Sequence, residues 1–280
     1  MTNIWQRRSI RCGEVETSYL EAGEGSPLVL LHGGEFGGSA EFSWERVIAP
    51  LAEQYRVIAP DIIGFGRSSK VVDFSDGRGW RLRHLAGLCS ALGIDEADFV
   101  GNSMGGAMLL ADLVSDASLL PIRRLVSVCG GGELEQNEHM AALMDYDASW
   151  NGMRRIVEAM FHDPSYASDE DYVTRRFSAS QETGAWEAVA AARFRRPGHK
   201  STSGAGESYD DVVIPVLLVE GDHDKLKPSG WAGRLAERIP GAAFAVIADS
   251  GHCPQIEQPE AFVRQLTAFL SDSKGNVHHD

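Results

Sequence analysis

A serine between two glycines, Ser103 in the segment Gly101–Gly105, is the residue of this chain with the clearest potential for chemistry. The G-x-S-x-G spacing lies between an apolar run and a helix-forming run, which is typical of a sharp strand-to-helix turn. Such a turn exposes the serine hydroxyl, and the helix that follows directs free N–H groups to the same point. Ser103 is therefore a candidate nucleophile. A glycine-rich turn with an incidental serine is the alternative.

Two later segments offer a base and an acid. Asp222 and Asp224 follow one apolar run, and His252 follows the next. Serine, then acid, then histidine, each after a strand, is the order of the α/β-hydrolase fold, which the chain resembles. Ser103 would be a nucleophile or a water-activating hydroxyl, His252 the general base and later acid, and Asp224 the carboxylate that orients the histidine.

Asp222 competes with Asp224 for the acid role. The G-x-x-D-x-x-x-P pattern of this fold matches Gly221, Asp224 and Pro228, which favours Asp224. His223 is interpreted as a loop residue. His252 is preferred as the base because it lies in a Gly-His turn after the strand that follows the acid.

Apolar runs separated by helical patterns predict the elements that must position these groups. Their interval indicates βαβ units and a mostly parallel sheet with helices on both faces. The expected strands are 14–20, 28–31, 55–60, 98–100, 124–129, 216–220 and 243–247, and the expected helices are 44–54, 82–92 and 107–114. After the second strand, Gly33 and Gly34 allow close backbone approach to a ligand, so they are candidates for a second oxyanion donor. His32 and Asp61 are expected to be packed or to satisfy loop amides.

The strand rhythm stops between residues 133 and 208, where charged and aromatic helical stretches replace it. We interpret 133–208 as an inserted helical lid and 1–132 with 209–280 as the α/β core. The lid helices are expected at 153–161, 169–178 and 184–194, followed by a flexible return at 195–206. Residues 271–280 are expected to form a frayed polar tail.

Composition narrows the partners and the compartment. With 26 Lys and Arg against 40 Asp and Glu, the formal charge of −14 disfavours nucleic acid or an anionic membrane. The N-terminus has no signal-like apolar core and no run approaches a membrane span, so the cytoplasm is expected. The cysteines have no C-x-x-C spacing, which predicts free thiols and no metal site; they are Cys12, Cys89, Cys129 and Cys253.

Several motifs resemble those of the meta-cleavage product hydrolases, within the α/β-hydrolase fold. They are residues 14–23, 55–61, 64–66, 101–106, 251–252 and 256–257, together with lid residues 151–177. The resemblance implies hydrolysis of a carbon–carbon bond in vinylogous 1,5-diketones, the ring-opened products of extradiol dioxygenases. It also implies no cofactor, a small-molecule substrate and a homo-oligomer, a dimer or larger.

Carried over by the resemblance, Gly34 and Met104 would donate the oxyanion-hole N–H groups, and Asn102 would help to bind the dienoate. Gly33 and Cys253 fall at further substrate-facing positions. The substrate carboxylate requires a guanidinium, and lid arginines 154, 155, 175, 176, 193, 195 and 196 are candidates. Among them we choose Arg176, next to Phe177, as the predicted ligand of the substrate carboxylate.

Three residues depart from the family pattern. Cys253 stands where tryptophan is typical after the histidine, Glu35 where glycine is common, and Ser43 where asparagine is common. Loss of the indole would enlarge the pocket, and an inward Glu35 would repel a carboxylate. A carboxylesterase or lactonase of the same fold is therefore the second hypothesis, and a non-catalytic receptor the third. A haloalkane dehalogenase is disfavoured, because it needs a carboxylate where Ser103 stands.

Overall fold

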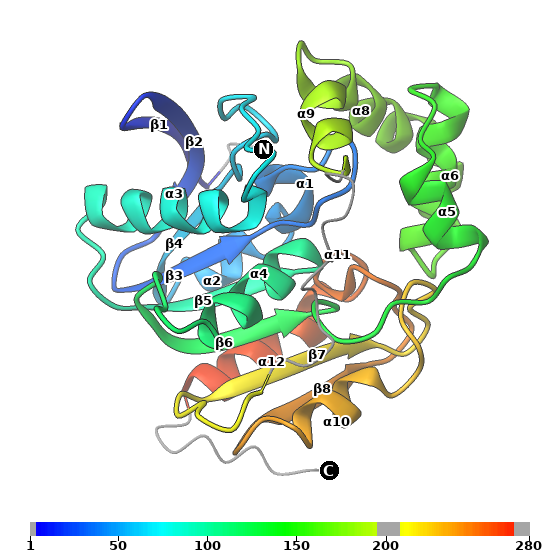
Figure 1. Cartoon of the computed structure of the whole chain (residues 1–280). Coiled ribbons are helices and arrows are strands. Elements are labelled where there is room, and N and C mark those ends of the chain that lie inside the picture. Colours follow the sequence, from blue (N-terminus) through cyan, green and yellow to red (C-terminus); the bar gives the residue numbers. More distant parts are fainter. Residues whose placement is uncertain (1–3, 195–207, 272–280) are drawn as a thin grey trace.

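In the computed structural model, which describes residues 4–194 and 208–271, the described strands form one sheet in the order β1-β2-β4-β3-β5-β6-β7-β8 (Figure 1). Their bounds are β1 Gln6–Cys12, β2 Val15–Ala22, β3 Ser26–Leu31, β4 Tyr55–Pro60, β5 Ala97–Asn102, β6 Ile122–Val128, β7 Val216–Gly221 and β8 Ala243–Ile247. Pairing is antiparallel from β1 to β2 and from β2 to β4, and parallel across the rest of the sheet. The predicted mostly parallel α/β sheet is confirmed.

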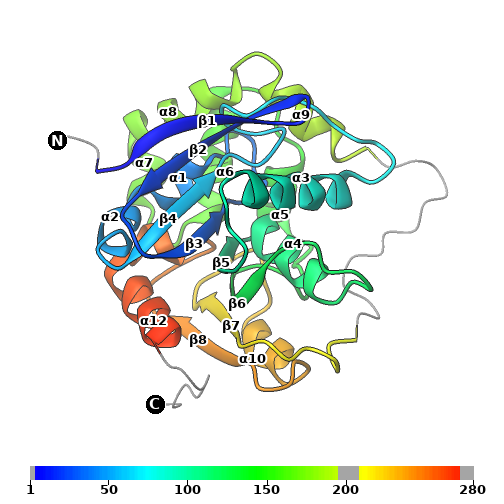
Figure 2. The same cartoon turned by 90° about the vertical axis from the view of Figure 1, so that its left-hand side faces the viewer.

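Helices cover both faces of the sheet (Figure 2). One face packs against α3 (Gly77–Ala91), α4 (Met104–Leu113) and α10 (Trp231–Ala236). The other packs against α1 (Ala40–Trp44), α2 (Ile48–Leu51) and α12 (Pro259–Ser271). The central strands are buried on both sides, which explains why they are apolar at successive positions instead of alternating ones.

Between β6 and β7 the chain forms a set of helices that we call the insertion, α5 to α9. They are α5 Glu138–Met144, α6 Trp150–Met160, α7 Ser165–Ser168, α8 Glu170–Ser180 and α9 Ala185–Ala191. Figure 1 shows them beyond the carboxyl ends of the strands. Ser103 directly follows the carboxyl end of β5. The predicted return at 195–206, with Arg195 and Arg196, lies outside the described residues, as does the predicted tail beyond Ser271.

The predicted helix at 44–54 is wrong in its form, because the chain makes the two short helices α1 and α2 there. Pro50 explains the break. Proline has no N–H to donate and its ring collides with the preceding turn inside a helix, so Pro50 is tolerated only in the first turn of a new one. Strand β1, an exposed edge strand, and the C-terminal helix α12 have no counterpart among the sequence predictions.

Two expectations about the chain as a whole can be compared with the structure. The four cysteines are free thiols, as their spacing predicted. Within residues 4–194 and 208–271, no helix combines the length and the hydropathy that crossing a bilayer requires.

Candidate active site

Ser103 occupies a strained turn between β5 and α4. Its φ of 51° and ψ of −112° lie in a region that residues with a side chain rarely adopt. The turn closes only because its neighbours are glycines: a Cβ on Gly101 would lie 2.4 Å from the backbone carbon of Gly105, and one on Gly105 would lie 2.5 Å from the oxygen of Leu31. The sharp turn predicted from the G-x-S-x-G spacing is therefore present.

Ser103, His252 and Asp224 form one connected row of hydrogen bonds. His252 Nε2 lies 2.8 Å from Ser103 Oγ, and His252 Nδ1 lies 2.7 Å from Asp224 Oδ2. If Nδ1 carries the proton and donates it to Asp224, Nε2 is free to accept the serine proton. The imidazole and the carboxylate are both buried, with side chains 3% and 1% exposed. The structure thus brings together the three side chains that the sequence singled out.

Asp224, and not Asp222, contacts the histidine. Burial acts to raise the pKa of Asp224, but the facing His252 with its hydrogen bond, the Leu226 amide and the Cys129 thiol together outweigh burial and hold the pKa below its ordinary value. The carboxylate is therefore ionised at neutral pH and can stabilise an imidazolium. Asp222 instead accepts a 3.2 Å hydrogen bond from the amide of Ser250 and holds the loop before His252.

The histidine loop is tied to the insertion by contacts that the sequence did not reveal. The amide of His252 donates to the carbonyl of Met160, at the end of α6, over 2.8 Å. Glu257, in α11 (Pro254–Glu257), accepts hydrogen bonds from Gly251 and from His162 at the start of the next insertion turn. The position of the base therefore depends on how the insertion is seated on the core.

Cys129 is a further neighbour that sequence analysis treated only as a free thiol. Its sulfur lies within 4.8 Å of the ligand atoms of Asp224 and His252. Burial raises the pKa of the Cys129 thiol well above its ordinary value, so it stays protonated beside the carboxylate. A neutral thiol with two groups already hydrogen-bonded to each other favours a triad over a metal site.

Gly34 and Met104, the residues predicted to donate the oxyanion-hole N–H groups, lie close to each other. A Cβ on Gly34 would lie 2.8 Å from Met104 Sδ and 3.1 Å from Met104 Cβ, so glycine allows the two segments to approach closely. Within the described ranges, neither amide has a hydrogen-bond acceptor. Two free N–H groups beside Ser103 can stabilise negative charge on a reacting carbonyl oxygen.

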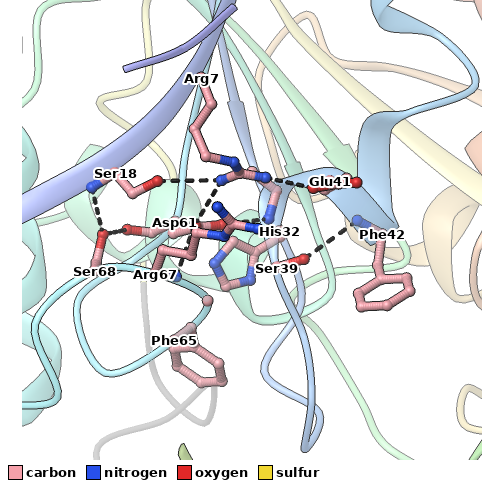
Figure 3. Close-up of polar contacts among 12 residues, drawn as sticks. Arg7, Ser18, His32, Ser39, Glu41, Phe42, Asp61, Phe65, Arg67 and Ser68 are labelled. Atoms are coloured by element: carbon pink, nitrogen blue, oxygen red, sulfur yellow. Dashed lines mark hydrogen bonds and ion pairs between the residues drawn. The ribbon is translucent and has the colours of Figure 1, made fainter. Parts of the chain in front are cut away.

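His32 and Asp61 support the loop that carries Gly34. His32 Nε2 accepts from the amide of Ile62, so Nδ1 carries the proton and donates to the carbonyl of Gly33 over 2.6 Å. Burial lowers the pKa of His32, in keeping with a neutral imidazole. Asp61 accepts from the amides of Ala40 and Arg67, and Figure 3 shows it in a network of polar contacts that includes Arg7 and Ser68. Both residues are structural, as their sequence context indicated.

Three residues predicted to bind substrate are buried against the protein instead of lining the cavity beside Ser103. Asn102 is 1% exposed, and its amide nitrogen donates to the carbonyls of Val128 and His252. The Cys253 thiol lies 3.9 Å from Asn102 Oδ1, and a Cβ on Gly33 would lie 2.5 Å from a carboxylate oxygen of Glu35. In this structure Asn102 acts as a brace for the histidine loop, and substrate contact by the three stays a prediction.

Arg176, the predicted ligand of the substrate carboxylate, is completely buried and paired. Its Nη1 lies 3.1 Å from Glu35 Oε1, and its Nε donates to the hydroxyl of Tyr172 over 3.0 Å. Burial acts to raise the pKa of Glu35, but the Arg176 charge, hydrogen bonds to the carboxylate and the nearby His32 together outweigh burial, so the pKa is lowered. Glu35 thus points inward, as its sequence position suggested it could, but it neutralises Arg176.

A cavity of about 860 Å³ opens onto Ser103 and His252. Gly34 and Met104 also line it, so the serine, the histidine and the two predicted oxyanion donors border the same space. Part of the remaining wall is apolar and comes from the insertion and nearby loops: Met140, Leu143, Met144, Met160 and Leu226. Four arginines (Arg78, Arg81, Arg193 and Arg238) and Glu35 line it too, whereas Arg176 is absent from the described lining residues. A concave space of this size that combines apolar walls with polar groups is typical of a small-molecule site.

Comparisons with known proteins agree with this geometry. The model of the alpha/beta hydrolase family matches residues 28–265. The chain is 34% identical to the 2-hydroxy-6-oxo-6-(2'-aminophenyl)hexa-2,4-dienoic acid hydrolase of Metapseudomonas resinovorans, over 96% of this chain and 92% of that protein. It is 32% identical to the 2-hydroxy-6-oxo-2,4-heptadienoate hydrolase of Pseudomonas putida, over 97% and 99%. The solved meta-cleavage product hydrolase CumD of Pseudomonas fluorescens superposes with a TM-score of 0.85 at 29% identity, over 94% and 97%.

Proposed function

We propose that this chain, which belongs to the alpha/beta hydrolase family and within it to the meta-cleavage product hydrolases, cleaves a carbon–carbon bond in 2-hydroxy-6-oxo-dienoates. The bond between C5 and C6 breaks. Water supplies the oxygen that converts C6 into a carboxylic acid, and the remaining carbons leave as a 2-hydroxydienoate. The observation that carries the proposal is the hydrogen-bonded row from Ser103 to Asp224 at the wall of the cavity.

Carbon–carbon hydrolysis needs one step that ester hydrolysis does not. The leaving carbon must be made stable as it departs, which requires the dienol proton of the 2-hydroxyl to move to C5 and give a ketone. His252 borders the cavity and contacts Ser103, so we assign it this proton transfer as well as activation of the hydroxyl or water.

The other groups act on the C6 carbonyl. Ser103 is the nucleophile or the hydroxyl that activates water, and its strained turn holds Oγ at the cavity wall. Asp224 fixes the histidine tautomer and stabilises the imidazolium. The amides of Gly34 and Met104 receive the developing oxyanion. Loss of one such donor costs about 100- to 1000-fold in kcat in serine hydrolases.

Segment 133–208 is assigned the role of a lid over this site. Its helices α5 and α6 contribute Met140, Leu143, Met144 and Met160 to the cavity wall. These side chains favour an apolar acyl substituent on C6. The carbonyl of Met160 accepts a hydrogen bond from the amide of His252, so closure of the lid would also position the base.

The experiment is a panel of ring-fission products with alkyl and aryl substituents, followed by the loss of their dienolate absorbance. We expect turnover of at least one member at a kcat/KM well above that for p-nitrophenyl acetate. Rapid hydrolysis of simple esters with no loss of dienolate absorbance for any member would overturn the proposal. That result would select the carboxylesterase or lactonase hypothesis.

Two further expectations, on the compartment and on the oligomeric state, complete the proposal. The chain acts in the cytoplasm, supported by its acidic composition and scattered free thiols. It works as a homo-oligomer, a dimer or larger, on a small-molecule substrate. Light scattering coupled to size exclusion measures the second expectation directly, and a mass of about 30.4 kDa at working concentration would contradict it.

A further inference from the structure

In this chain the substrate carboxylate needs a partner other than Arg176. This inference rests on the proposed function. A 2-hydroxy-6-oxo-dienoate carries a carboxylate at C1 and the reacting ketone at C6. Arg176 already faces Glu35, and both side chains are buried, 0% and 4% exposed. Nη2 of Arg176 has no hydrogen-bond partner, yet Glu35 supplies the single negative charge that the guanidinium needs. A second carboxylate there would meet a neutral pair and the repulsion of Glu35.

Arg81, on α3, presents a different environment. It lines the same cavity as Ser103 and His252. Its guanidinium lies over the ring of Phe65, 5.6 Å from the centroid, and Nη1 lies 4.0 Å from Met104 Sδ. Within residues 4–194 and 208–271, Arg81 forms no ion pair with a carboxylate, whereas Arg83, two residues further along α3, pairs with Asp76 over 2.8 Å.

The surroundings of Arg81 make its charge costly. A ring face and a thioether give little compensation for lost water, and a charged group that has lost water needs a counter-ion. Burial accordingly lowers the pKa of Arg81, with no acidic neighbour acting against it. Arg193, the insertion arginine at the cavity, differs because Nη1 donates to the carbonyls of Leu143 and Met144.

The position of Arg81 suits a substrate that bears its charge some distance from the reacting carbon. The side chain of Met104 lies between the Arg81 guanidinium and Gly34, whose amide is assigned to the oxyanion hole. We propose that Arg81 binds the substrate carboxylate in this chain and selects acyl compounds with an anionic group several bonds from the carbonyl. A guanidinium can hold a carboxylate through two parallel hydrogen bonds, which also fixes the orientation of the dienoate.

Binding of sorbate, a dienoate without a scissile ketone, tests this assignment without any turnover. We expect the wild-type chain to bind sorbate at least tenfold more tightly than its neutral amide, measured by calorimetry. Arg81→Gln should weaken sorbate binding by about 10- to 150-fold, the effect of losing a hydrogen bond to a charged group. Arg81→Lys should recover part of the loss, and Arg83→Gln, the matched control, should leave it within threefold of wild type. Circular dichroism verifies that each variant is folded.

Kinetics separate this inference from the proposed function. Arg81→Gln should lower kcat/KM for a dienoate, and for the p-nitrophenyl monoester of adipate, by a similar factor, while p-nitrophenyl hexanoate changes less than threefold. Equal loss on both esters would make Arg81 structural, and a selective loss in Arg176→Met with none in Arg81→Gln would return the role to Arg176. Either result overturns the assignment. If no dienoate is cleaved but the Arg81 dependence of sorbate and of the anionic ester holds, the proposed function fails and the assignment stands.

Discussion

Removal of the Glu35 charge by Glu35→Gln would leave the Arg176 guanidinium buried without a counter-ion. The two groups are 3.1 Å apart, and their side chains are 4% and 0% exposed. Removing one member of such a buried pair costs about 3–5 kcal/mol, because the desolvated charge that remains has no partner. At about 2–4 °C per kcal/mol for a domain of this size, the melting temperature should fall by about 6–20 °C.

Urea denaturation of four proteins measures this cost as a double-mutant cycle. They are the wild type, Glu35→Gln, Arg176→Met and the double variant. We expect each single variant to lose several kcal/mol and the double variant to lose much less than their sum, because it buries no unpaired charge. Glu45→Gln is the matched control. Glu45 pairs over 3.0 Å with Arg175, which precedes Arg176 in α8, but the side chains of Glu45 and Arg175 are 26% and 50% exposed. The free energy of unfolding of Glu45→Gln should therefore fall by less than about 1 kcal/mol.

The same pair predicts a dependence on pH. The pKa of Glu35 is lowered in the folded chain from an ordinary value of 4.5. A carboxyl group with a lowered folded pKa contributes stability that is complete above the unfolded pKa and is lost as the pH falls through the folded value. The stability difference between wild type and Glu35→Gln should therefore be constant above about pH 5.5 and shrink below it. A loss under 0.5 kcal/mol at pH 7, or a difference that grows on acidification, would refute this account of the pair.

Two further substitutions test the triad and its turn. Asp224→Asn should lower kcat by about 1000- to 10,000-fold with little change in melting temperature, because the histidine would be held in the wrong tautomer; a decrease below tenfold in stopped-flow turnover would exclude Asp224 from the row. Gly101→Ala would place a Cβ 2.4 Å from the backbone of Gly105, so we expect a loss of at least about 1–3 kcal/mol in urea denaturation. Gly87→Ala, on α3 where a Cβ has nothing within 4 Å, is its control and should be neutral or stabilising.

The elements that carry chemistry were the most predictable from sequence. Strands 55–60 and 243–247 were predicted with the bounds that the structure gives, because each is a short run with clear turn residues on either side. The triad followed from three local patterns whose order along the chain is itself informative. Their meeting in space follows from the parallel sheet, since the carboxyl ends of its strands lie on one edge.

Contacts between distant segments were not predictable in the same way. Glu35 was read as a residue that would repel a substrate, but its partner Arg176 lies 141 positions away and only the packed insertion brings them together. Arg81 lies one residue before the helix predicted at 82–92 and was not singled out from the sequence, because no local pattern indicates that a helix faces a cavity. Strand β1 was missed since it is an exposed edge with polar residues, where burial imposes little alternation.

Product analysis after a single turnover tests the central claim most directly. A 2-hydroxy-6-oxo-dienoate is mixed with excess protein, and the products are separated and identified by mass. The account predicts one carboxylic acid and one 2-hydroxydienoate for each substrate consumed by the wild type, and neither from Ser103→Ala. Equal yields from Ser103→Ala, or consumption of the dienoate by the wild type without the acid product, would contradict it.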